Sequence, residues 1–173
     1  MTAPPPPGRR RGRLVIAALL PLPGCAGPVA VGGDLTAIAA DEASLCIRTH
    51  GAPVPVTVEV ARTNTSRAAG LSGRATLAPQ AGMLFLYRRP RPADSGFWMY
   101  RTRIPLDIAY LDTQGHIRAI HHMEPCGTEP AGCPVYPATV QYQAALEVNA
   151  GFFSRHGIVV GDRLVVSGPE CPE

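Results

Sequence analysis

The chain has 173 residues, of which 46% are hydrophobic and 17% charged, and its formal net charge is +3. This length fits one folded domain, because single cores usually run to roughly 100–200 residues. The 19 prolines and 18 glycines argue against a helical bundle and indicate a body rich in loops.

Residues 1–24 have the three-part layout of a secretory signal peptide. A basic stretch at 9–13 precedes the apolar run 14–22, which is shorter than the roughly 20 residues of a spanning helix. Leu22-Pro23-Gly24-Cys25 resembles a lipobox, although its proline replaces the usual small residue. We therefore expect an exported lipoprotein, held to the membrane by a lipid on Cys25 and facing the periplasm or the cell exterior.

Removal of this segment changes the charge of the chain. All four of its charged residues are arginines, so the basic count falls from 16 to 12 against 13 acidic residues, and the net charge falls from +3 to −1. The remaining chain has no basic stripe with interleaved aromatic residues. Nucleic acid is therefore not an expected partner.

Four cysteines remain besides the lipidation site, and an even number is typical of an oxidising compartment. Cys126 and Cys133 lie in one Gly/Pro-rich loop, whereas Cys46 and Cys171 flank the domain. We expect these two pairs to form disulfides. A four-thiolate zinc site is the alternative, but paired C-x-x-C spacing is absent.

The domain is expected over residues 54–167, after a flexible Ala/Gly/Pro-rich tether at 25–53 and before a tail at 168–173. Valine at every second position of 54–60 predicts a half-buried strand. Its apolar face consists of Val54, Val56, Val58 and Val60. Capping residues around an Ala-rich turn at 63–71 predict a short helix.

Short apolar runs predict the remaining strands, at 83–87, 97–99, 106–111, 116–121, 141–148 and 163–166. The turn Asp112-Thr113-Gln114-Gly115 joins two of these runs as a hairpin. A second short helix is expected after Gly151 and ends near His156. Many short strands with Gly/Pro turns favour a mostly β (α+β) fold, a small barrel-like or folded-over sheet with one or two short helices.

Several motifs occur in order along the domain: Gly82-Met83-Leu84-Phe85, Phe97-Trp98-Met99, Ile104-Pro105-Leu106-Asp107-Ile108, Leu146-Glu147-Val148-Asn149-Ala150-Gly151, His156-Gly157-Ile158 and Gly161-Asp162. Their order and spacing resemble the Domain of Unknown Function 192 family. The resemblance implies a small, mostly β domain that is often exported and has no settled activity. Tyr100-Arg101 departs from the usual Lys-Asn, so contacts of those side chains are not carried over.

Five residues of these motifs are candidates for ligand binding: Met83, Trp98, Met99, Asp107 and Glu147. Tryptophan and methionine offer adaptable apolar surface, and their alternative role is core packing. A carboxylate inside an apolar strand must be paired, hydrogen-bonded or exposed. Two carboxylates in one cleft can bind a cation or act as acid and base. Because their strands follow closely along the chain, we expect Trp98 and Asp107 to share a cleft.

His121, His122 and Met123 are ligand types that copper or zinc accepts. Adjacent strand residues point to opposite faces, so the two histidines are not expected to chelate together. The sequence also lacks a G-x-S-x-G elbow, an H-E-x-x-H motif and a phosphate-binding P-loop. We therefore expect no metal, no cofactor and no catalytic residue.

The function that these patterns favour is that of a non-catalytic binding or accessory lipoprotein of the cell envelope. Its partner is expected to be a small molecule or an envelope protein of unknown identity. Two alternatives remain open: an uncharacterised hydrolase that uses Asp107 or Glu147 with a histidine, and a protein that handles copper or zinc.

Overall fold

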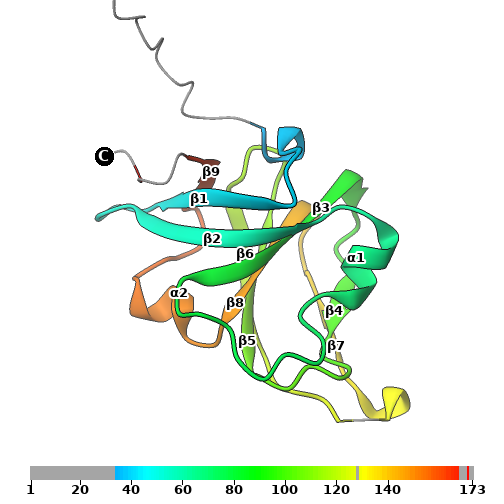
Figure 1. Cartoon of the computed structure of the whole chain (residues 1–173). Coiled ribbons are helices and arrows are strands. Elements are labelled where there is room, and N and C mark those ends of the chain that lie inside the picture. Colours follow the sequence, from blue (N-terminus) through cyan, green and yellow to red (C-terminus); the bar gives the residue numbers. More distant parts are fainter. Residues whose placement is uncertain (1–33, 128, 168–170, 172–173) are drawn as a thin grey trace, which may run out of the picture.

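The computed structural model describes residues 34–127, 129–167 and 171, so the expected signal peptide and Cys25 lie outside the described residues. Its main element is one curled sheet of seven strands that forms a half-barrel (Figure 1). The strand order across the sheet is β6-β5-β8-β3-β2-β1-β9. The predicted mostly β fold, with a folded-over sheet and two short helices, is confirmed.

The seven strands are β1 (Glu42–Arg48), β2 (Val54–Ala61), β3 (Ala81–Arg91), β5 (Leu106–Leu111), β6 (Ile117–Met123), β8 (Tyr142–Asn149) and β9 (Arg163–Val166). A separate two-stranded ribbon consists of β4 (Gly96–Trp98) and β7 (Val135–Pro137). The helices are α1 (Asn64–Ala69) and α2 (Phe152–Arg155), with 3-10 turns η1 (Leu35–Ala37) and η2 (Pro130–Gly132). Within the described residues, no helix has the length and hydrophobicity needed to cross a membrane.

The strand patterns follow from local sequence. In β2 the four predicted valines are buried, and the residues between them are more exposed. The predicted hairpin of β5 and β6 is confirmed, and Asp112 Oδ1 accepts hydrogen bonds from the backbone N–H groups of Gln114 and His116 in its turn. Strands β2 and β3 are parallel, and the other pairings are antiparallel.

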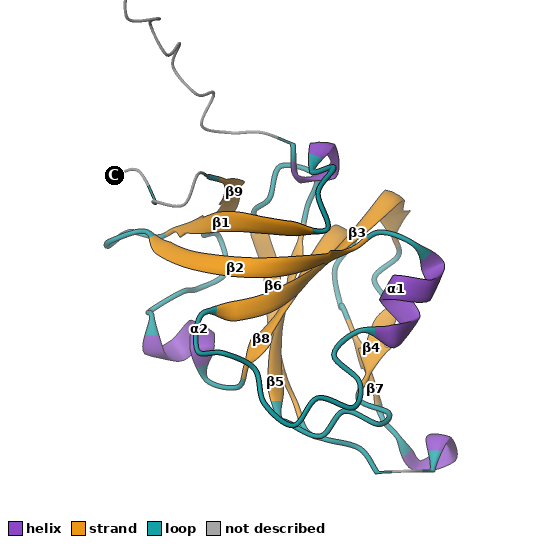
Figure 2. Ribbon diagram, viewed as in Figure 1, coloured by secondary structure: helices purple, strands orange, loops and turns teal. Residues whose placement is uncertain are grey.

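The sheet buries a separate hydrophobic cluster on each face. The first includes the valines of β2, Phe152 and Phe153 of α2, and Ile158. The second includes Phe85, Tyr110 and Tyr142, with Phe97 of the ribbon packed against it. Figure 2 shows α1, β4 and β7 together on one side and α2 on the other. Strand β5 is buried along its whole length because both of its faces are covered.

The two edge strands of the curled sheet, β6 and β9, are connected by backbone hydrogen bonds near their ends. The N–H of Ile117 donates to Asp162 O at 2.8 Å, and the N–H of Gly161 donates to Ile117 O at 2.9 Å. The N–H of Leu164 donates to Gly115 O at 2.8 Å. These bonds use part of each edge internally, which limits the unpaired backbone that an edge strand would otherwise expose.

The expected tether at 25–53 was wrong in its second half. Residues 42–48 form β1, which pairs with β2 and β9, and its Leu45 and Ile47 are buried in the core. Leu35 of η1 is buried there too. The Ala/Gly/Pro-rich composition of this stretch indicated a tether. Strand β1 is held in the sheet by its pairing with β2 on one side and β9 on the other.

Both expected disulfides are present. Cys46 of β1 is joined to Cys171, with a Cα–Cα distance of 5.6 Å and a sequence separation of 125 residues. Cys126 and Cys133 close a short loop before β7, also at 5.6 Å. The Cys46–Cys171 disulfide joins β1 to Cys171 near the end of the chain. This covalent link is further evidence that residues 42–48 belong to the folded domain and not to a tether.

A chain that begins at Val54 is expected not to fold cooperatively, because it lacks β1 and leaves β2 and β9 without their shared partner. A chain that begins at Asp34 should fold. Urea unfolding followed by circular dichroism compares the two. The double substitution Cys46→Ser/Cys171→Ser in the Asp34 chain separates the loss of the disulfide from the loss of the strand. Equal unfolding midpoints for the Val54 and Asp34 chains would show that β1 is dispensable.

Candidate functional site

Glu147 is a buried carboxyl group near the middle of the sheet. It lies in β8 opposite Met83 of β3 and Ile108 of β5, and only 5% of the residue is exposed. Among the described residues its carboxyl group has neither a hydrogen bond nor an ion pair. Burial raises the pKa of Glu147 to about 8. The side chain is therefore mostly protonated at neutral pH.

A pocket of about 50 Å³ opens beside this carboxyl group. Its walls come from α1 with the turn after it, and from the segment 97–102 with the end of the β4 ribbon. Thr102 lines the pocket and is 7% exposed, and no hydrogen bond to its hydroxyl occurs within the described chain. The hydroxyl of Ser72 donates to Tyr100 O at 3.4 Å. The pocket thus combines a carboxyl group and hydroxyl groups.

Trp98 and Tyr100 form the aromatic wall of this pocket. Their ring centroids lie 5.2 Å apart, and Trp98 is 50% exposed. Phe97 has the opposite orientation and packs against Phe85 at 4.8 Å, as strand alternation requires. Core packing is therefore the role of Phe97, and Trp98 is free to contact a ligand.

The disulfide loop supports the aromatic wall. The backbone of Cys126 forms an isolated parallel β-bridge with the backbone of Tyr100. The N–H of Cys126 donates to Met99 O at 3.3 Å. Trp98 pairs with Val135 of β7, the strand that follows the loop. Strand β7 was not predicted, because it has only three residues, follows one proline and ends in another, and so carries no periodic signal.

Asp107 lies on the other face of the sheet from Glu147. Its direct partner in β8 is Val148, whereas Glu147 is opposite Ile108. Asp107 Oδ2 accepts the N–H of Gly151 at 2.8 Å, and Oδ1 lies 2.9 Å from Nδ1 of His122. Gly151 has φ +76, a backbone conformation that favours glycine. Asp107 therefore holds the turn before α2 against β6.

His122 is held between two carboxylates. Nδ1 lies 2.9 Å from Asp107, and Nε2 lies 2.9 Å from Glu124. The hydrogen bond to Asp107, and then the one to Glu124, raises the pKa of His122 above its ordinary value. Both partners are carboxylates, which accept hydrogen bonds, so the protonated ring donates from both nitrogens and has no lone pair that could act as a base.

The expected shared cleft of Trp98 and Asp107 was wrong. Trp98 lines the Glu147 pocket, whereas Asp107 lines a different hollow with His122 and Gly151. The reason is the pairing: β4 pairs with β7, and β5 pairs with β6 and β8, so the two residues never become neighbours across strands. The two carboxylates do not converge either, because the pleat directs them to opposite faces.

Met83 and Met99 are part of the core. Met83 is 6% exposed and Met99 is 1% exposed, and both belong to the second hydrophobic cluster. His121 packs edge-on against Tyr110 on that face. His122 is on the opposite face with Asp107, so the two histidines are separated as expected. In the described part of the chain, no group of three or more His, Cys, Asp or Glu residues could hold a metal ion.

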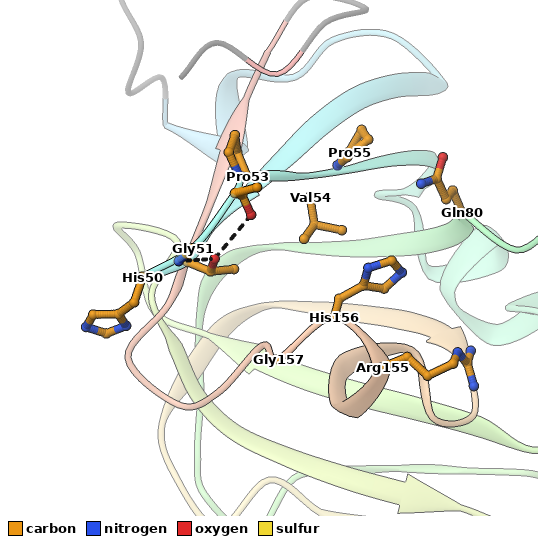
Figure 3. A pocket seen from close by; sticks show the side chains of 11 residues that line it. His50, Gly51, Pro53, Val54, Pro55, Gln80, Arg155, His156 and Gly157 are labelled. Atoms are coloured by element: carbon orange, nitrogen blue, oxygen red, sulfur yellow. Dashed lines mark hydrogen bonds between the residues drawn. The ribbon is translucent and has the colours of Figure 1, made fainter.

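A larger hollow of about 540 Å³ lies between the β1–β2 turn and the end of α2 (Figure 3). His156 and Arg155 line it, and the side chain of His50 points away from the other labelled side chains. Arg155 Nη1 donates to Ala150 O at 3.0 Å, and His50 Nδ1 lies 3.7 Å from Asp162. None of the residues that line this hollow has a buried side-chain nitrogen or oxygen atom without a hydrogen-bond partner.

Glu147 should make the protein less stable as the pH rises. The unfolded carboxyl group ionises at about pH 4.5 and the folded one at about 8. Between these values the folded state binds the extra proton, so the folding equilibrium constant attributable to Glu147 falls about tenfold per pH unit. Urea titrations from pH 4 to 9 should show this fall in the wild type and its loss in Glu147→Gln.

Glu59→Gln is the matched control for this measurement. The hydrogen bond from Arg74 lowers the pKa of Glu59, so its contribution to stability is lost at low pH, the opposite sign. Parallel stability–pH curves for the wild type and Glu147→Gln between pH 5 and 8 would contradict a protonated Glu147.

Comparison with known proteins agrees with this fold. The DUF192 family, described as uncharacterized ACR, matches residues 45–166. A crystallised protein from Sinorhizobium meliloti 1021, described as a candidate transcription regulator, is 32% identical with a TM-score of 0.64, covering 71% of this chain and 92% of its own. A protein of unknown function from Novosphingobium aromaticivorans DSM 12444 is 29% identical with a TM-score of 0.63, covering 77% and 98% respectively. No curated protein matches. The match over residues 45–166 shows that this chain belongs to the DUF192 family.

Proposed function

We propose that the protein is a non-catalytic binding lipoprotein of the cell envelope and that the Glu147 pocket is its ligand site. The observation that carries this proposal is a buried carboxyl group that has no partner among the described residues and that opens on a pocket. Burying such a group costs free energy unless something compensates it. A ligand that supplies the missing partner would recover that free energy on binding.

The surroundings of Glu147 suit a ligand. Binding sites combine apolar, often aromatic walls with a few placed polar groups. Trp98 and Tyr100 supply the wall, and Glu147 with Thr102 supplies the polar groups. The half-exposed Trp98 also places the pocket where a small molecule or a segment of an envelope protein has access.

The hydrolase alternative has less support. No histidine lines the Glu147 pocket, so Glu147 has no base or acid partner of that type there. His122 beside Asp107 has both ring nitrogens bonded to carboxylates, and among the described residues it makes no hydrogen bond to a serine, threonine or cysteine side chain. The pairing of Asp107 and His122 is accounted for by the turn that it holds.

The proposed envelope location rests on two observations. The first is the signal-like layout of residues 1–24 before Cys25. The second is the presence of two disulfides, which persist in oxidising compartments and are rare in the cytosol. A lipid on Cys25 would keep the domain at the membrane surface.

Membrane-extracted protein is expected to lack residues 1–24 and to carry a diacylglyceryl group on Cys25. Intact-mass spectrometry of protein from its native envelope measures both changes. Cys25→Ser should prevent the modification and release the protein from the membrane fraction. An unmodified wild-type protein with a different N-terminus would refute lipidation.

Glu147→Gln and Trp98→Ala are each expected to abolish complementation of a deletion strain, measured as growth under detergent stress. Both variants should remain folded, because glutamine is isosteric with glutamate and the Trp98 side chain is already half exposed. Val160→Ala, an exposed position that does not line the pocket, is the matched control and should complement fully. Thermal unfolding checks the fold of each variant. Full complementation by folded Glu147→Gln would end the proposal.

A further inference from the structure

We propose that the Glu147 pocket binds a primary ammonium group carried on a slender chain. This inference rests on the proposed binding function and names the class of ligand. Its starting point is the geometry of the pocket: a carboxyl group at the base, aromatic rings at the side and a hydroxyl group nearby.

The pocket lacks a cation for its carboxyl group. Arg67 also lines it, but its guanidinium donates to Leu86 O at 2.8 Å and to Asn64 Oδ1 at 2.6 Å. Arg67 lies over the ring of Tyr87 as well, at 4.8 Å from the centroid. Glu147 makes no ion pair with any described residue, so a cation that pairs with its carboxylate would come from a ligand.

The other groups of the pocket suit an ammonium ion. An ammonium carries three N–H donors and needs acceptors for them. The carboxylate of Glu147 supplies one acceptor, and the Thr102 hydroxyl, which has no partner in the described residues, can supply another. The face of Trp98 attracts a cation through the ring quadrupole, whereas Arg101 already lies over the ring of Tyr100, at 5.1 Å from its centroid.

The size of the pocket selects a slender group. A volume of about 50 Å³ is far below the roughly 300–1,000 Å³ of a typical small-molecule site, so only a narrow group can enter. An ammonium head and its first methylene fit this space. A guanidinium, a quaternary ammonium or a sugar ring is bulkier, so we expect each of them to bind more weakly than a primary ammonium.

The protein itself cannot supply the ammonium from a side chain. The 16 basic residues counted as Lys and Arg are all arginines, so the chain contains no lysine. A second copy of the chain has none either. The ammonium is therefore not a side chain of this protein, and we expect it to come from a free amine or from a lysine side chain of another protein.

Binding should release a proton. The ammonium arrives charged, Glu147 loses its carboxyl proton to solvent, and the two charges pair in the pocket. Affinity should therefore rise about tenfold per pH unit below the carboxyl pKa and level off above it. A neutral ligand would show no such rise.

The test is a titration of the full-length protein with n-butylamine, followed by the fluorescence of Trp98, the only tryptophan in the chain. We expect a saturable change that strengthens about tenfold from pH 6 to pH 7. The neutral isostere n-butanol and the bulky cation tetramethylammonium should bind at least tenfold more weakly. Glu147→Gln should weaken n-butylamine binding at least tenfold, Thr102→Val should weaken it severalfold, and Val160→Ala should leave it unchanged.

A second titration, with Nα-acetyl-lysine methylamide, identifies the source of the ammonium. Binding at least tenfold tighter than that of n-butylamine assigns a lysine side chain of a partner protein, and equal binding assigns a free amine. Either result supports the ammonium class.

The ammonium inference is overturned if n-butylamine gives no saturable change, if n-butanol binds equally well, or if Glu147→Gln leaves n-butylamine binding intact. If the amine-binding test fails but Glu147→Gln still does not complement the deletion strain, the proposed binding function stands and only the ammonium inference is lost. Failure of both measurements ends the binding function too.

Discussion

The burial of the Glu147 carboxyl group is the constraint on which the rest of this domain depends. Strand β8 is central and pairs on both sides, so its backbone positions are determined by β3 and β5. Residue 147 must then project from the face that α1 and the β4–β7 ribbon cover. A carboxyl group placed there either takes up a proton or acquires a cation, because an isolated buried carboxylate is costly. Valine or leucine at this position would avoid that cost. The presence of a carboxyl group there instead is what distinguishes this pocket.

The structure around Glu147 is arranged in support of its pocket. The ribbon directs Phe97 inward and Trp98 outward, and β7 and the Cys126–Cys133 loop hold it in place. On the other face, Asp107 and His122 fix the turn at Gly151, close along the chain to Glu147. The two carboxyl groups therefore have different roles. Asp107 of β5, which has partners, is structural, and Glu147 of β8, which has none among the described residues, is available to a ligand.

Much of the fold could be predicted from local sequence. The alternating valines of β2, the turn between β5 and β6, and the cysteine pairs are signals that neighbouring residues carry by themselves. Strand β1 was not predicted, because the Ala/Gly/Pro-rich composition of residues 25–53 indicated a tether, and β7 was not predicted, because it has only three residues and pairs with β4, which is distant in sequence. Of the residues predicted to bind a ligand, Trp98 and Glu147 line one pocket, whereas Met83 and Met99 are packed in the core. The separation of Asp107 from Glu147 depends on the register of β5 against β8, which no local pattern reveals.

The most direct test of this account is an NMR titration of the Glu147 side-chain carboxyl carbon in the folded, ligand-free protein, assigned by comparison with Glu147→Gln. The buried carboxyl group without a partner should titrate with a pKa of about 8. Its chemical shift at pH 6 should then be that of a protonated carboxylic acid. A midpoint at or below the ordinary value of 4.5 would show that Glu147 already has a partner or is open to water, and would contradict the account.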